Sequence, residues 1–542
     1  MPTNLPKSIS KRDGRLVPFE PEKLSRSLFA ATEVMNAPDA FLARELTDSV
    51  LHFLSLEEFG QKPPTTAHLA EVVATVIREL GHPVLAKTYF QSVQHVRPEK
   101  PAPRLGVAPP ADRDWISPNH DPFSVIHRAA RAELSHFSLR RVYPRDLASA
   151  HCDGLLHLMD VGTPQEIVGI VLSAQQPTPV DAWELLKTLV DLRQIAGSLV
   201  AFDGPERTLV ARQGIPEELA GRFAEALDRA LWLSDFHGIL NLNVAEPPAW
   251  AAPISLGPLF PEYQKEIAGE WLDRIALFLL RRTRRQTVFW HLAERDFLDE
   301  GQPRLGEIIS RASARDSVEF VFDRPNRPVI LGPGMSRACP AALGMVGVNL
   351  PRFVDQLGGG PIEQDIFLKK LGSLARFAKS AGYARQDFLR KQGRSPLHEG
   401  FLLERAVEIV LPIGVMEAAQ KILGDANDVE SIAELARRIM ETIRVALDSD
   451  QLRTMATCID TPLNHPEIQT DIKSFAANDP ISKSLLPRQQ LRYGSALLAA
   501  AGGGCLTIRM NRMGSTDVSI IIDLLKTAWR GDVTRLRFAW ED

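Results

Sequence analysis

Cysteine is scarce in this chain. Its 542 residues include four cysteines: Cys152, Cys339, Cys458 and Cys505. They lie far apart in the sequence, and none belongs to a Cys-x-x-Cys pair. Disulfide frameworks and cysteine zinc sites need clustered cysteines, so the sequence favours neither. We therefore expect no bound zinc and a location in the cytoplasm.

Long apolar runs and an excess of one charge are also lacking. No apolar stretch approaches the roughly 18 residues that a membrane span needs, and the opening sequence MPTNLPKSIS has no apolar signal-peptide core. The formal net charge is -4, which gives no general attraction to nucleic acid or to a membrane surface. We expect neither as a partner. A chain of this length is expected to fold into two or more domains.

Prolines mark a boundary near residue 100. Residues 98–122 hold seven of them: Pro98, Pro101, Pro103, Pro109, Pro110, Pro118 and Pro122. Proline interrupts both helix and strand hydrogen bonding, so this stretch is predicted to be an extended linker. It separates an N-terminal unit, residues 1–97, from a body, residues 123–542.

The N-terminal unit is predicted to be a β-hairpin followed by four helices. Strand-like runs at Ser8–Lys11 and Leu16–Phe19 flank an Asp-Gly turn signal. Later apolar residues recur at helical spacing, and we expect Thr66 to cap one helix and Gly81 to end it.

Three cations of this unit would converge if the hairpin folds over the first helix. They are Lys11, Arg12 and Lys23. Such a cluster, next to a helix N-terminus, suits a triphosphate. The alternative is a solvated basic hairpin, because basic surface runs are common.

The motifs of this unit resemble the ATP-cone. They are Lys11-Arg12-Asp13-Gly14, Phe19-Glu20-Pro21-Glu22-Lys23, Glu79-Leu80-Gly81-His82 and Ala86-Lys87-Thr88-Tyr89, in the order that the ATP-cone has them. The resemblance implies binding of ATP or dATP, with Mg²⁺ expected alongside. It places Ile9, Lys11, Arg12, Lys23 and Thr66 at nucleotide-contacting positions. Lys and Arg would hold phosphates, and Thr66 with its apolar neighbours would face the base.

The body mixes helices and strands. Apolar spacing predicts helices at Asp181–Val200, Pro216–Ser234, Pro261–Arg282, Ile362–Ala381, Leu402–Leu423 and Val429–Leu447. Apolar runs predict strands at Ile239–Val244, Val318–Phe322, Gly344–Leu350, Leu506–Met510 and Val518–Ile522. Strands alternating with long helices indicate an α/β fold, with a barrel as one possibility.

Fragments of the body resemble the anaerobic, class III, ribonucleotide reductases. They are Pro144, Ala150-His151, Gly154, His157 and Asp160, then the strand Gly344–Arg352 ending in Asn-Leu-Pro-Arg, then Ile413-Gly414-Val415-Met416-Glu417-Ala418, then Gly502-Gly503-Gly504 before Cys505–Met510. Alone, the spacing of His151, His157 and Asp160 suits no common metal motif, so a structural role is expected for them. The resemblance implies a glycyl-radical-enzyme-like ten-stranded α/β barrel.

The same resemblance implies that a radical-carrying cysteine lies on a finger loop before the Asn-Leu-Pro-Arg strand. In Gly332–Pro340 the only candidate is Cys339, although Ser336 could occupy the family position instead. The family's zinc site and glycyl-radical loop follow its last strand, and the sequence to Asp542 contains neither. Ser380-Ala381-Gly382-Tyr383 echoes the glycyl motif and is interpreted as chance. Thr461-Pro462-Leu463-Asn464 lacks the glutamate of the family's Thr-Pro-x-Glu segment. We expect no glycyl radical in this chain.

Three functions follow from these patterns. The first is a degenerate class III paralogue that senses ATP or dATP, forms homo-oligomers through the cone, and contacts a reductase or a radical-supplying protein. The second is an active anaerobic ribonucleoside-triphosphate reductase that uses a radical supplied in trans, with Cys339 as thiyl carrier. The third is a transcriptional regulator, which is disfavoured because no cysteine precedes the cone.

Overall fold

The structure is a computed structural model. It describes residues 5–11, 14–56, 63–94, 122–172, 182–211, 216–234, 236–245, 261–282, 286–298, 301–313, 317–325, 327–359, 362–393, 397, 402–424, 428–448, 455–461, 485–511, 518–531 and 533–541. Arg12 and most of the predicted linker lie outside these residues. Pro122, the last residue of that predicted linker, instead begins a helix.

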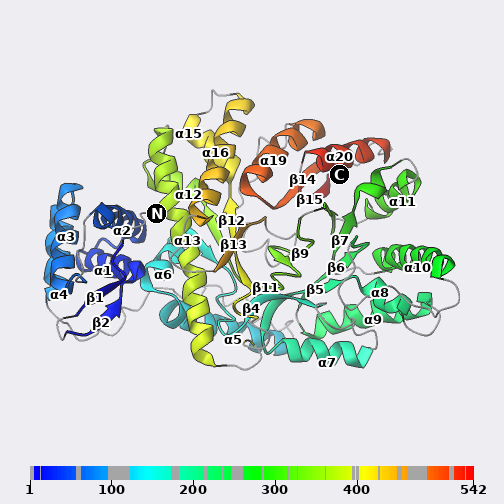
Figure 1. The fold of residues 1–542 in the computed structure, drawn as a ribbon, viewed down its shortest axis with the longest axis horizontal. Helices are drawn as coiled ribbons and strands as arrows, with labels where there is room; N and C mark the ends of the chain where they lie inside the picture. Colours follow the sequence, from blue (N-terminus) through cyan, green and yellow to red (C-terminus); the bar gives the residue numbers. More distant parts are fainter. Residues whose placement is uncertain are drawn as a thin grey trace.

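The N-terminal unit is a hairpin with four helices, as predicted. Its elements are β1 (Ser8–Ser10), β2 (Leu16–Pro18), α1 (Pro21–Val34), α2 (Ala40–Leu56), α3 (Thr66–Glu79) and α4 (Pro83–Gln94). The two strands are antiparallel. Gly14 has a φ of 79° and Gly81 a φ of 90°, so both glycines provide the left-handed conformation that the turn and the helix end require. Figure 1 shows this unit at one end of the molecule.

One predicted cap is wrong by one residue. The N-cap of α3 is Thr65, whose hydroxyl accepts from the N–H of His68. Thr66 is the first helical residue, and its hydroxyl donates to the carbonyl of Ser10 at 3.1 Å. Two adjacent threonines are equivalent as sequence signals, and the contact with the hairpin decides between them.

The body contains one large sheet made of two parallel halves. The first half comprises β4 (Ile167–Leu172), β5 (Ala196–Asp203), β6 (His237–Leu242), β7 (Thr287–Leu292) and β8 (Val318–Phe322). The second comprises β11 (Ala341–Asn349), β12 (Ala406–Ile413), β13 (Ala456–Ile459), β14 (Cys505–Asn511) and β15 (Arg535–Glu541). The halves meet antiparallel at β4–β11 and at β8–β15.

These ten strands form one path from β13 to β14, and β3 (Leu156–Leu158) pairs with β11 beside it. The two ends of the path approach each other, because the N–H of Cys505 donates to the hydroxyl of Thr461 at 2.9 Å. The sheet therefore curls into the barrel-like body of Figure 1, and the predicted α/β class is confirmed.

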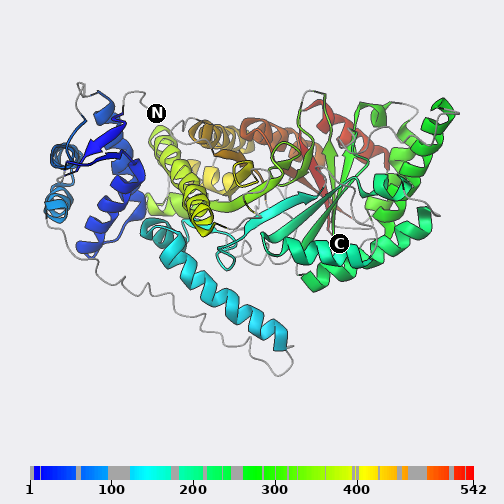
Figure 2. The same cartoon turned by 60° about the horizontal axis from the view of Figure 1, so that its bottom comes forward.

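Helices surround this sheet (Figures 1 and 2). They are α5 (Pro122–Phe137), α6 (Arg145–Cys152), α7 (Ala182–Leu192), α8 (Pro205–Ala211), α9 (Pro216–Ser234), α10 (Pro261–Arg282), α11 (Gln302–Ala312), α12 (Leu350–Gln356), α13 (Gln364–Gln392), α15 (Val415–Leu423), α16 (Val429–Asp448), α19 (Pro487–Ala501) and α20 (Val518–Arg530). A π-helical turn, Ser138–Val142, follows α5, and a 3₁₀ turn spans Glu294–Phe297.

Three predicted elements need correction. The predicted helix Asp181–Val200 is α7 followed by the start of β5, and the predicted helix Leu402–Leu423 is β12 followed by α15. Strands covered on both faces are continuously apolar, so they lack the alternation that marks a strand. The predicted strand Val518–Ile522 is the start of α20, whose buried residues Ile521, Leu524, Leu525 and Ala528 have helical spacing.

A hairpin fills the middle of the barrel. Its strands are β9 (Ile330–Gly332) and β10 (Met335–Ser336). Leu331 and Met335 pack in one buried cluster with Leu199, Ile239, Phe289, Val407 and Ile409, which come from strands of both halves. Separate apolar clusters lie between the sheet and the helices outside it. In the described part of the chain, no helix is long and apolar enough to cross a membrane.

Candidate functional site

The hairpin of the N-terminal unit is held against the start of α3. The N–H of Ser10 donates to the carbonyl of Pro64 at 2.9 Å, and the Thr66 hydroxyl donates to the carbonyl of Ser10. Ile9 and Lys11 flank Ser10 in the chain. The structure therefore brings three of the five predicted nucleotide-contacting residues together at a helix N-terminus.

Lys23 lies in the first turn of α1, directly after the hairpin. Its ammonium pairs with Glu20 at 2.7 Å, and its side chain is 61% exposed. An exposed ion pair contributes little stability, so a phosphate can compete with Glu20 for this cation. The fifth predicted residue, Arg12, lies outside the described residues.

The N-terminal unit packs directly on the body through α2. The rings of Phe41 and Phe353 meet edge to face with centroids 4.8 Å apart. Glu45 pairs with Lys370 at 3.2 Å, and Asp48 pairs with Arg376 at 2.6 Å. Phe353 lies in α12 and both cations lie in α13, which packs on β11. A shift in the position of α2 can therefore displace α12 and α13, and through α13 the barrel strand β11, because their side chains are packed together.

The turn of the inner hairpin is Pro333-Gly334. Gly334 has a φ of 62°, and its N–H donates to a carboxylate oxygen of Asp460 at 2.9 Å. A Cβ at Gly334 would lie 2.6 Å from the sulfur of Cys458. The thiol at this turn therefore comes from β13. Burial first, and then the charge of Asp460, raise the pKa of the Cys458 thiol well above its usual value, so it stays protonated.

Cys339 lies at the base of the same hairpin, beyond β10. Its N–H donates to the hydroxyl of Ser336 at 3.2 Å, and the N–H of Ser336 donates to the carbonyl of Cys339 at 3.0 Å. The two residues close a small turn that leads into β11, and Cys339 is half-buried. Its role as thiyl carrier stays a prediction. Nothing in the sequence marks Cys458, because only a contact between distant segments brings its thiol to the turn.

The hairpin is fixed at its base by polar groups at the ends of the first-half strands. Arg337 holds both carboxylate oxygens of the buried Asp203, at 2.7 and 3.0 Å. The side-chain amide of Asn241 donates to the carbonyl of Leu331 at 2.9 Å. These hydrogen bonds fix the position of the inner hairpin and of its Pro333-Gly334 turn.

An ionic centre lies beside the turn, where β8 of the first half and β15 of the second half meet. Arg535 donates to Glu319 at 3.0 Å and also to Asp460, and its guanidinium stacks on Phe289 at 5.1 Å. Arg535 and Glu319 are 1% exposed. Charges buried this deeply persist because each has a partner, and Asp460 links the pair to the hairpin.

Three of the four reductase-like fragments meet at one end of the barrel. Asn349 caps α12 by accepting from the N–H of Arg352, and its side-chain amide donates to the carbonyl of Gly154 at 3.1 Å. Gly414 has a φ of 70°, and a Cβ there would lie 2.5 Å from Pro351. The fragments therefore share a packing role. His151 has a structural contact as expected, because its ring accepts from the N–H of Leu158 at 3.2 Å.

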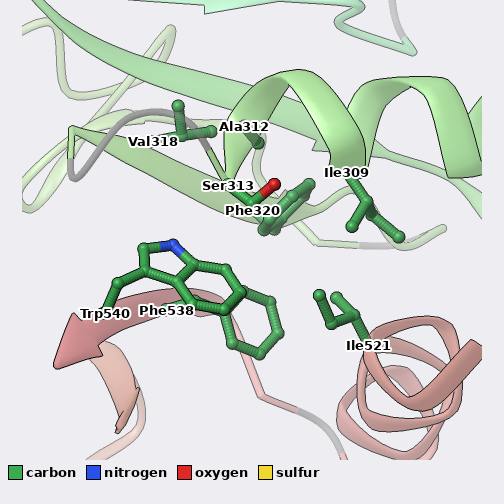
Figure 3. Close-up of a pocket in the computed structure, with 8 residues that line it drawn as sticks. All are labelled: Ile309, Ala312, Ser313, Val318, Phe320, Ile521, Phe538 and Trp540. Carbon is green, nitrogen blue, oxygen red and sulfur yellow. The ribbon is translucent and has the colours of Figure 1, made fainter. Parts of the chain in front are cut away.

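A small pocket lies on the outer side of the barrel, between α11, β8, β15 and α20 (Figure 3). It encloses about 250 Å³, part of it open to solvent, and its lining is Ile309, Ala312, Ser313, Val318, Phe320, Ile521, Phe538 and Trp540. The lining carries no charge, and the pocket is separate from the barrel interior and from the N-terminal hairpin.

Comparisons with known proteins agree with both parts of the chain. Residues 7–92 match the ATP cone domain. The body is similar to the anaerobic ribonucleotide reductase of Thermotoga maritima in complex with dATP and CTP, with a TM-score of 0.59 and 12% identity, over 77% of this chain and 83% of that one. The structure of the same enzyme with dATP bound in the specificity site gives a TM-score of 0.59 and 13% identity, over 77% of this chain and 85% of that one. Curated proteins give no match. At such identity the likeness establishes the fold of the body.

Proposed function

We propose that this protein is a nucleotide sensor, a paralogue of class III ribonucleotide reductase in which the cone binds ATP or dATP and the barrel has a regulatory role. The observation that carries the proposal is the arrangement of Ile9, Lys11 and Thr66 around Ser10 at the start of α3. Lys23 lies in the first turn of α1, and the partial positive charge of that helix N-terminus favours a phosphate beside it.

In this proposal Lys11, Arg12 and Lys23 hold the phosphates, and Ile9 and Thr66 face the base. Mg²⁺ accompanies the triphosphate. Nucleotide binding acts by favouring one assembly over another, as a homo-oligomer through the cone or with a reductase or radical-supplying protein as partner.

The inner hairpin supports a role without radical chemistry of its own. Its turn holds Pro333 and Gly334, and the nearest thiol there, Cys458, is half-buried and protonated. A regulatory barrel needs no radical chemistry: it needs only to change its contacts with partner chains when a nucleotide occupies the cone.

Calorimetric titration of the full chain with ATP and with dATP tests the sensor function. We expect saturable binding to the wild-type protein and binding at least roughly tenfold weaker for Lys11→Ala/Arg12→Ala, because charge-assisted hydrogen bonds to phosphate are lost. Lys526→Ala, a lysine on α20 far from the cone in the chain, is the control and should bind as the wild type does. Absence of binding to the wild type would remove the proposal.

The second candidate function is an active reductase with the radical supplied in trans and Cys339 as thiyl carrier. The observation in its favour is that Cys339 lies at the base of the hairpin inside the barrel. An anaerobic assay of ribonucleoside-triphosphate reduction with candidate radical donors tests it. Product formation that survives Cys339→Ala excludes that residue as the carrier, and a parallel Cys458→Ala variant asks whether the thiol at the turn is needed instead.

A further inference from the structure

Charged side chains gather along one strip of the barrel interior. Where β8, β15 and β14 lie side by side, the inward positions are Glu319 on β8, Arg535 and Arg537 on β15, and Thr507 on β14. Many other inward positions are apolar, including Val168, Leu199, Ile239 and Met345. The polar Asn241 and Asp203 instead hold the inner hairpin. Cations on this strip need compensating anions or solvent, because unpaired buried charge is costly.

The two carboxylates of this strip are already engaged by Arg535. One guanidinium nitrogen of Arg535 donates to Glu319 and another to Asp460. Asp460 also accepts from the N–H groups of Gly334 and Thr461. Neither carboxylate is therefore free to neutralise a second cation fully.

Arg537 is that second cation. Its Nη2 donates to the Thr507 hydroxyl at 2.9 Å. Its Nη1 is buried and lies 3.9 Å from Glu319, beyond hydrogen-bond distance. Within the described part of the chain, this Nη1 has no hydrogen-bond acceptor. The side chain is 16% exposed whereas Glu319 is 1% exposed, so Arg537 lies where the buried centre meets solvent.

The inward positions next to Arg537 are a small residue, a hydroxyl and a second arginine. In the register of β14 and β15, Thr507 lies opposite Arg537 and Arg509 lies opposite Ala539. Strand side chains alternate between faces, so Arg509 and the small Ala539 share the face of Thr507 and Arg537. Arg509 and Thr507 are both half-buried. A hydroxyl, an unsatisfied guanidinium N–H and a second arginine thus surround one spot.

We propose that Arg537, Thr507 and Arg509 form an oxyanion-binding site inside the barrel, which takes a phosphate or carboxylate group of a small ligand. Arginine presents its N–H groups in a planar fork that matches two oxygens of such an anion, and Nη1 of Arg537 supplies the unused donor. This site is separate from the nucleotide site of the cone and does not depend on it.

Calorimetric titration of the full chain with inorganic phosphate, and separately with malonate, tests the proposal. We expect binding of one or both to the wild-type protein, and binding roughly tenfold to a hundredfold weaker for Arg537→Gln. Arg530→Gln, the same change at an exposed arginine of α20, is the matched control and should bind as the wild type does. The arm that binds more tightly, phosphate or malonate, identifies the anion class.

The cone could also take up phosphate, so each titration is repeated in the Lys11→Ala/Arg12→Ala protein. Anion binding that persists in the Lys11→Ala/Arg12→Ala protein and is lost in Arg537→Gln supports the barrel site, whatever the outcome of the ATP titrations. Anion binding that is lost in the Lys11→Ala/Arg12→Ala protein and kept in Arg537→Gln overturns the barrel site. Absence of anion binding to the wild type overturns it as well. If Arg537→Gln does not fold, Thr507→Val removes the hydroxyl alone, and unchanged binding by that variant also overturns the proposal.

Discussion

Gly382 and Gly344 leave space for one buried carboxylate, that of Glu408. A Cβ at Gly382 would lie 2.8 Å from the Glu408 side chain, and one at Gly344 would lie 2.7 Å from its Oε2. Gly382 belongs to the segment that echoes a glycyl-radical motif, and here it lies within α13 against β12. The close approach of helix and strand accounts for glycine at this position. Burial raises the pKa of Glu408 to about 8, and Arg385 only partly opposes this.

The Glu408→Gln variant should alter the pH dependence of stability. Glu408 holds its proton in the folded protein up to about pH 8 but in the unfolded chain only to its usual pKa of 4.5. The stabilisation from the neutral acid is full below pH 4.5 and is lost as pH rises through about 8. The free energy of unfolding of the variant, minus that of the wild type, should therefore rise across this window, by about 1.4 kcal/mol per unit of pKa difference.

Chemical denaturation at a series of pH values measures this effect. Glu404→Gln changes a carboxylate of the same segment that is 43% exposed, and its profile should run parallel to that of the wild type. Parallel profiles for Glu408→Gln as well would mean that Glu408 ionises normally in the folded protein.

At the scale of elements, α2 couples the cone to α13. The Asp48–Arg376 pair is mostly buried, with side chains 13% and 19% exposed, and Asp48 also faces the buried Arg44 at 3.7 Å. Ion pairs shielded from water interact more strongly than surface pairs, provided that both partners are present. This contact is therefore expected to fix the orientation of the cone.

A double-mutant cycle with Asp48→Ala and Arg376→Ala measures that coupling by chemical denaturation. We expect a coupling energy of about 1–3 kcal/mol. Asp48→Ala should be the costlier single change, because it also leaves Arg44 without its partner. The Glu225–Arg229 pair of α9, 65% and 75% exposed, is the reference, with about 0.2–1 kcal/mol expected. A cycle at Asp48–Arg376 that gives no more than this reference would show that the pair does not fix the cone.

At the scale of the whole molecule, the docking of the cone predicts joint unfolding of cone and body. Scanning calorimetry should show that ATP raises the temperature of the main unfolding transition. A ligand at a hundred times its Kd stabilises the folded state that binds it by about 2.7 kcal/mol. Arg376→Glu places two like charges beside each other at the interface. We expect it to separate an ATP-sensitive transition of the cone from an ATP-insensitive transition of the body.

Arg229→Glu, at an exposed position of α9, should leave the single ATP-sensitive transition intact. Two transitions already present in the wild-type protein, with ATP moving one of them alone, would contradict the coupling. This prediction rests on nucleotide binding by the cone, so it is informative once ATP titration has established that binding.

Local features of the fold could be predicted because they depend on neighbours in the chain. The Asp13-Gly14 turn signal, the stop at Gly81 and the helices at Pro216–Ser234 and Pro261–Arg282 follow from backbone preferences and apolar spacing within a few residues. The predicted strand Val318–Phe322 has the same bounds in the structure. Buried strands such as β5 and β12 were mistaken for helices, because an apolar run covered on both faces carries no period of two.

By itself the sequence determined the class of the fold, the order of the cone and body, and the cone motifs that predict nucleotide contacts. Tertiary structure alone decided that Thr66 bonds to Ser10, that Asn349 bonds to Gly154, that Cys458 lies at the turn of Gly334, and that Arg537 keeps an unused donor. These contacts join residues tens to hundreds of positions apart. Their formation depends on how the two halves of the barrel and the cone pack, which short-range preferences do not encode.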